Sequence, residues 1–190
     1  APARAAIARL DAARVAGDFE RAMAQGLSAL AAGRTADART ALNRALALRP
    51  GDAGARAALT QLDSDERRSR LTSLQAEAER LAAAERWAEA ADRYRELLGL
   101  DATLAAARDG LAVADSRAGL NQRLEQQLAN GERFNDDAVV AGAQAVLRDA
   151  GAVPAPGPVL TAQVSRLGEL IAAAATPVPV QFESDNLTSV

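Results

Sequence analysis

The chain has 190 residues, of which 49% are hydrophobic but only 3% aromatic, so a folded core must rely on alanine and aliphatic side chains. It contains no cysteine, histidine or lysine, which excludes thiolate and imidazole metal sites, cysteine nucleophiles and histidine bases. The formal net charge of -3 argues against sequence-independent nucleic-acid binding, because such binding needs a basic surface.

The two ends of the chain resemble cut ends. The chain begins with Ala1 and Pro2 and no methionine, and it stops at Val190 within a pattern. No apolar run approaches the ~20 residues that span a bilayer, and no basic segment followed by an apolar one opens the chain. We expect a piece of a longer protein, with no membrane insertion within this piece and any anchor outside it.

A repeat with a shift of 52 residues runs along the chain. "ARAAIARLD" at residues 3–11 recurs as "ARAALTQLD" at residues 55–63, and a third, shorter copy follows from residue 107. The matching apolar pairs fall at helical spacing, as in Ile7 with Leu59 and Leu10 with Leu62. The repeat therefore copies one buried helix face.

Each copy predicts a helical hairpin. In the first, an apolar stripe with steps of three and four residues predicts a long helix. Gly33 supplies a stop, Thr35 a cap, and a second stripe continues to Pro50. The Pro-rich linker "VPAPGP" precedes a final helix. We expect a helical domain over residues 1–175, with modules at about 3–52, 53–102 and 103–150 and a terminal helix at 159–175.

This pattern resembles the tetratricopeptide repeat (TPR), a helix-turn-helix of 34 residues with small residues, an aromatic position and a closing proline. Leu97 and Ala102 depart from the family pattern, where a small residue and a proline are usual. The resemblance implies an all-α fold of antiparallel hairpins with elongated first helices. The repeat positions that carry it are Gly26, Ala38, Leu42, Ala45, Pro50, Ala78, Trp87, Ala90, Tyr94, Phe134 and Ala138.

The shift of 52 exceeds the 34 residues of the TPR family. Either each first helix extends to about 30 residues, roughly 45 Å at 1.5 Å per residue, or a separate short helix precedes each repeat. Residues 55–98 contain no glycine or proline, which favours one long helix. Gly17 and Asp18 mark the best candidate break.

Residues 176–190 change character, with Val178, Val180 and Phe182 alternating as in a strand, and they predict a truncated β segment. Long-helix repeats, a Pro-rich linker and such a tail resemble bacterial envelope proteins whose repeats lie in the periplasm behind a membrane anchor. That resemblance implies a periplasmic location, with a cytoplasmic one as the alternative.

Three features have both a functional and a structural interpretation. Asp136 and Asp137 form a carboxylate pair, but adjacent acids at a helix start usually meet its free amides. The mixed charges of residues 64–70, "SDERRSR", favour a solvated helix face over a binding site. Trp87, Tyr94 and Phe134 fall on repeat core positions, which favours packing over a peptide-binding patch.

The sequence therefore predicts a non-catalytic scaffold for protein–protein interaction, with a protein or peptide partner and no nucleic-acid partner. We expect no catalytic, cofactor or metal site; the oligomeric state is left open. The alternative is a sensory, ligand-binding ectodomain of a transmembrane signalling protein such as a Ser/Thr kinase.

Overall fold

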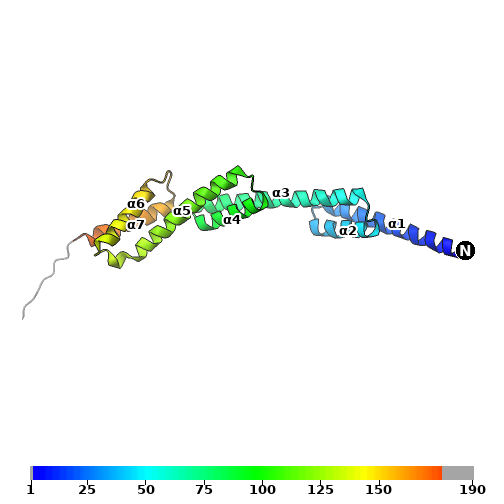
Figure 1. Cartoon of the computed structure of the whole chain (residues 1–190), viewed down its shortest axis with the longest axis horizontal. Coiled ribbons are helices and arrows are strands. Elements are labelled where there is room, and N and C mark those ends of the chain that lie inside the picture. Colours follow the sequence, from blue (N-terminus) through cyan, green and yellow to red (C-terminus); the bar gives the residue numbers. More distant parts are fainter. Residues whose placement is uncertain (1, 177–190) are drawn as a thin grey trace, which may run out of the picture. The chain divides into compact units, whose positions relative to one another are not determined.

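The computed structural model describes residues 2–176, and 85% of these residues are helical. Within these residues seven α-helices and a 3-10 turn follow one another without a strand (Figure 1). Their bounds are α1 (Pro2–Ala31), α2 (Thr35–Leu48), α3 (Ala53–Ala83), α4 (Trp87–Leu100), α5 (Ala105–Ala129), η1 (Gly131–Arg133), α6 (Asp137–Gly151) and α7 (Pro158–Ala174). The all-α prediction is confirmed; apart from Thr176, the predicted β segment lies outside the described residues.

The first helix of each hairpin is continuous. α1 has 30 residues and α3 has 31, whereas α2 and α4 have 14 each. Gly17 lies inside α1 without a break, in a segment rich in alanine and arginine, both strong helix formers. The structure thus decides for the long helix and against a separate short one.

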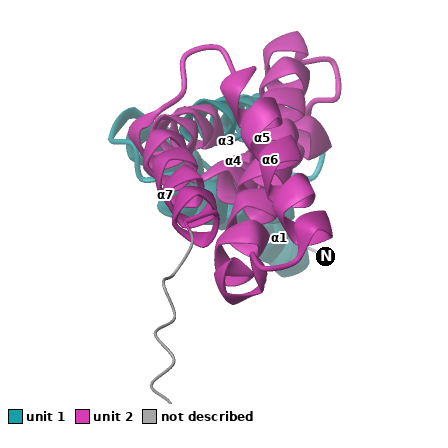
Figure 2. Ribbon diagram, turned by 90° about the vertical axis from the view of Figure 1, so that its left-hand side faces the viewer, with its two compact units in different colours: residues 1–73 teal, residues 74–190 magenta. Residues whose placement is uncertain are grey.

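The described chain divides into two compact units, one up to Ser73 and one from Leu74 onward (Figure 2). The division falls within α3. The first unit therefore contains α1, α2 and the beginning of α3, and the second contains the end of α3 and all later helices.

The core of the first unit lies between α1, α2 and α3. It is built from small side chains around a few large ones, and its buried members are Phe19, Ala22, Ala29, Ala38, Leu42, Ala45, Ala55 and Leu62. A Cβ added to Gly26 would lie 2.8 Å from Cγ of Leu42, so this position must be small. The repeat glycine therefore permits close approach of α1 and α2.

At the corresponding seam of the second unit, both positions carry larger residues. Ala78 and Tyr94 stand where the first unit has Gly26 and Leu42, at the shift of 52 residues. The larger Tyr94 ring is accommodated by Gly110 on α5, where an added Cβ would lie 2.5 Å from the ring. Both seams thus combine a large side chain with a glycine, but a different helix supplies the glycine.

Two turns share one hydrogen-bond pattern. Arg34 N–H donates to the Ala29 carbonyl, and Arg86 N–H donates to the Leu81 carbonyl, each at 2.9 Å. This is the Schellman closure of a helix end, which requires a left-handed residue before the donor. Gly33 fills that position with φ 70°, and Glu85 fills it with φ 55°.

The third hairpin differs because its first helix, α5, has only 25 residues. The turn passes through η1 to Phe134, which is buried in a core formed by α5, α6 and α7. Asp136 then caps α6 by accepting the N–H of Ala138 at 2.9 Å, as predicted. Ala138 itself is exposed, contrary to its expected packing role, and Ala143 and Val146 are buried on α6 instead.

Candidate functional site

The repeat positions singled out in the sequence mostly form helix seams. Five of them are fully buried, namely Ala38, Leu42, Ala45, Ala78 and Ala90. Gly26 and Phe134 are also buried, Trp87 and Tyr94 are partly buried, and Pro50 lies exposed in the turn after α2. Most of these residues therefore hold the helices together, and a binding surface would have to be formed by the exposed residues beside them.

The aromatic side chains do not gather into a patch. Trp87 and Tyr94 pack against the cluster of Leu81, Ala90 and Ala114, whereas Phe134 belongs to the separate core of α5, α6 and α7. Arg117 covers the Trp87 ring with its guanidinium carbon 4.8 Å from the ring centroid. The packing interpretation agrees with this placement.

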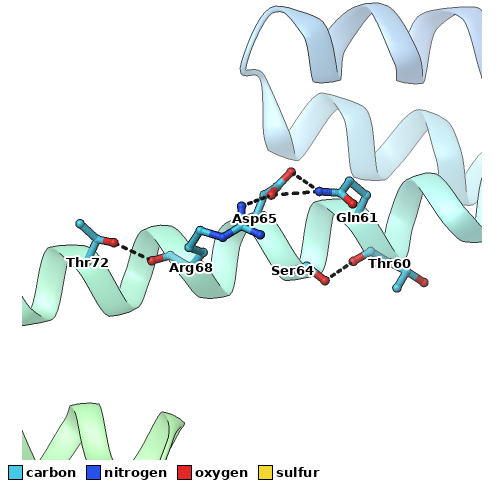
Figure 3. A network of polar contacts seen from close by, with 6 residues as sticks. All are labelled: Thr60, Gln61, Ser64, Asp65, Arg68 and Thr72. Atoms are coloured by element: carbon cyan, nitrogen blue, oxygen red, sulfur yellow. Dashed lines mark hydrogen bonds and ion pairs between the residues drawn. The ribbon is translucent and has the colours of Figure 1, made fainter. Parts of the chain in front are cut away.

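The charged run on α3 is an exposed helix face. Residues 63–70 are all exposed, and neighbouring side chains bond along the helix: Gln61 and Arg68 both donate to Asp65 (Figure 3). The hydroxyl groups of Ser64 and Thr72 donate hydrogen bonds to the backbone carbonyls four residues earlier, those of Thr60 and Arg68, at 2.8 and 3.1 Å (Figure 3). The predicted solvated face is confirmed. Asp65 is engaged within α3, whereas Asp63 and Glu66 each lie 2.7 Å from Arg39 of α2.

A buried carboxylate was not anticipated from the sequence. Glu85 is 8% exposed, and its oxygens accept the backbone N–H groups of Val159 and Leu160 at the start of α7. Arg117 lies 3.6 Å from Oε2 of Glu85. Because both oxygens are engaged, this cluster is a structural cap for α7. In the sequence, Gly157 and Pro158 indicate that a helix starts there. They do not indicate that Glu85 caps it.

The first unit has an open groove between α1 and α2. Its volume is about 590 Å³, and it is lined by Ala24, Gln25, Ser28, Ala29, Arg34, Asp37, Thr40, Ala41 and Arg44. Alanines contribute the apolar lining, and Arg34 pairs with Asp37 at 3.2 Å. With two arginines and one aspartate among its lining residues, the groove carries a positive balance of charge.

The corresponding surface of the second unit is crossed by ion pairs. Arg93 lies 3.9 Å from Glu77 and 2.5 Å from Glu96, and Arg86 pairs with Glu89. The hydrogen bond from Arg86 lowers the pKa of Glu89 and raises that of Arg86. At the shift of 52 residues, Glu96 replaces the Arg44 of the groove, so the two surfaces differ in charge.

Between residues 2 and 176, no group of acidic side chains is arranged to hold a metal ion. None of the helices from α1 to α7 is long and apolar enough to cross a membrane.

No protein-family model, no curated protein and no solved structure matches this chain. The residues themselves therefore provide the basis for a functional proposal.

Proposed function

We propose that the chain is a non-catalytic scaffold for protein–protein interaction, built on TPR-like hairpins, and that the groove between α1 and α2 binds an acidic peptide segment. The observation that carries this proposal is the groove itself, with its alanine lining and its two arginines. Small side chains let a peptide backbone approach closely. Arginine holds carboxylates through two parallel N–H donors, which gives both affinity and orientation.

The contrast between the two units supports this location. In the second unit the arginines of the matching surface are paired with glutamates of the same chain. A carboxylate from a partner would have to displace those pairs. In the groove Arg34 is paired with Asp37 in the same way, but Arg44 forms no ion pair within the described residues. An acidic segment therefore meets less competition in the first unit.

The proposal can be tested by selecting a random peptide display library on the immobilised intact chain. We expect the selected peptides to be rich in Asp and Glu and to bind at least about tenfold more weakly to Arg44→Glu, since a lost charge-assisted contact is worth about 1.5–3 kcal/mol. Arg148→Glu on the exposed face of α6 is the matched control, because it makes the same charge change outside the groove. Equal weakening by both variants, or none by Arg44→Glu, would contradict the groove as the binding site.

We also propose that the chain is the periplasmic part of a membrane-anchored bacterial protein. Its support is the combination of long-helix repeats, a Pro-rich linker and the changed composition after Thr176. Alkaline phosphatase and green fluorescent protein can each be fused after Val190 in the full-length protein. If the chain is periplasmic, we expect the phosphatase fusion to be active and the green fluorescent protein fusion to be non-fluorescent. An inactive phosphatase with a fluorescent fusion would place the chain in the cytoplasm.

A further inference from the structure

The beginning of α1 exposes an apolar stripe. All residues from Pro2 to Arg14 are exposed, including Ile7 and Leu10, whose side chains are 60% and 71% accessible. These two residues lie three positions apart and thus on one face of the helix. We call Ala3, Ile7, Leu10 and Asp11 the α1 stripe.

The same positions are covered wherever the repeat recurs. On α3 the counterparts Leu59 and Leu62 pack against Ala38 of the preceding hairpin, and Ala55 is fully buried beside Ala45. On α5 the counterparts Leu111 and Ala114 pack against Ala90 and Ala91. In both places, an alanine-rich face of a helical hairpin covers the stripe.

A charge contact accompanies each covered stripe. Asp63 on α3 accepts Arg39 of α2 at 2.7 Å, and Asp115 on α5 accepts Arg95 of α4 at 2.5 Å. The third member of this series, Asp11, has only the 3.9 Å contact with Arg14 on its own helix within the described residues, and its side chain is 65% exposed. The α1 stripe thus retains both the apolar pair and the carboxylate of a hairpin interface.

We propose that the α1 stripe docks a helical hairpin of the same kind as α1–α2, with alanines facing Ile7 and Leu10 and an arginine reaching Asp11. The two covered stripes within this chain show the chemistry of the occupant: small residues at the seam and a guanidinium at its edge. The α1 stripe is a separate surface from the groove, because it contains none of the groove's lining residues.

The test uses a tandem protein in which a second copy of residues 1–52 precedes the complete chain. In this protein the added copy of α2 precedes Ile7 and Leu10 by the same number of residues by which α2 precedes Leu59 and Leu62. Amide hydrogen exchange is measured at residues 7–11 of the complete chain, with and without the added copy. We expect exchange there to slow at least tenfold on addition of the copy.

A charge exchange controls for the specific contact. Asp11→Arg in the complete chain should reduce the protection, and Arg39→Asp in the added copy should restore it. Ile7→Ser with Leu10→Ser should abolish the protection while leaving the exchange of α4 unchanged.

Two results would overturn the proposal. One is exchange at residues 7–11 that is as fast in the tandem protein as in the chain alone. The other is a concentration-dependent dimer of the unextended chain, seen by analytical ultracentrifugation and lost on Ile7→Ser with Leu10→Ser, because the occupant would then be the α1 stripe of a second copy.

Discussion

Glu85 caps a helix that begins far along the chain: its Oε1 accepts the N–H of Val159, 74 residues later, at 2.6 Å. Oε2 accepts the N–H of Leu160 at 3.0 Å, so two of the unpaired amides at the start of α7 are satisfied by one side chain. Glu85 holds this place with φ 55°, at the turn position where the first hairpin has Gly33. A strained residue thus replaces glycine where its side chain joins the second hairpin to α7.

Removing the cap should destabilise the second unit. Glu85→Ala loses both hydrogen bonds, so we expect the free energy of unfolding to fall by about 2 kcal/mol. Glu85→Gly should lose about 1 kcal/mol less, because glycine relieves the left-handed backbone. The fluorescence of Trp87, the chain's single tryptophan, reports denaturant unfolding of this unit.

Glu89→Ala is the matched control for the cap. It removes a carboxylate of the same hairpin that forms an exposed ion pair with Arg86, so the loss of stability should be clearly smaller than that of Glu85→Ala. Equal effects of Glu85→Ala and Glu89→Ala would show that the cap contributes no more than a surface pair.

Gly157→Ala should destabilise the second unit because the added methyl group would collide with the Glu85 carboxylate. An added Cβ would lie 2.3 Å from Oε1 of Glu85, although the φ of -80° suits alanine. We expect a loss of about 1–3 kcal/mol from this overpacking. Gly168→Ala on α7 meets nothing within 4 Å and should gain about 0.5–1 kcal/mol through helix propensity.

The cause of the Gly157 effect can be isolated by a double-mutant cycle followed by chemical denaturation. In the Glu85→Gly background the obstructing carboxylate is absent, so Gly157→Ala should have little effect. A loss of the same size in both backgrounds would assign it to the backbone of Gly157.

The Tyr94–Gly110 seam gives a second pair of matched substitutions. Gly110→Ala places a Cβ 2.5 Å from Cζ of the Tyr94 ring, so we expect destabilisation by about 1–3 kcal/mol. Gly119→Ala on the same helix α5 meets nothing within 4 Å and should stabilise by about 0.5–1 kcal/mol. Thermal unfolding by circular dichroism measures both, and a similar sign for the two variants would contradict the close packing.

Burial raises the pKa of Tyr94 above its ordinary value of 10.0, and the negative charge of Glu79 adds to this effect. Since Tyr94 is the only tyrosine, the near-ultraviolet absorbance of tyrosinate follows its titration directly. We expect a midpoint above 10.0 in the folded chain and an ordinary midpoint in denaturant.

The stability consequence has a definite sign. Above pH 10 the unfolded chain releases the tyrosine proton first, so stability that is present below pH 10 declines as pH rises toward the folded pKa. Tyr94→Phe should remove this part of the alkaline decline. A folded midpoint at or below 10.0 would contradict the burial of the hydroxyl.

The sequence predicted features that depend on local periodicity. The shift from Ile7 to Leu59, the stop at Gly33 and the acid at Asp136 led to the helical hairpins, the first turn and the cap of α6, and the structure contains all of them. Ala138 was placed wrongly in the packing because the shortened α5 and η1 change which face of α6 is buried. The groove was not predicted, because its lining residues lie between the positions that the repeat emphasises.

What the sequence alone determined is the set of helices and the face that each can bury, because hydrogen bonding along a helix and its apolar stripe are properties of neighbouring residues. Only the tertiary structure decided which of those faces is covered and which distant groups meet. Leu62 is buried and Leu10 is exposed although both belong to the same repeated motif, since among residues 2–176 a hairpin packs on Leu62 and none packs on Leu10. Glu85 is likewise buried and paired because the amino end of α7 lies beside it.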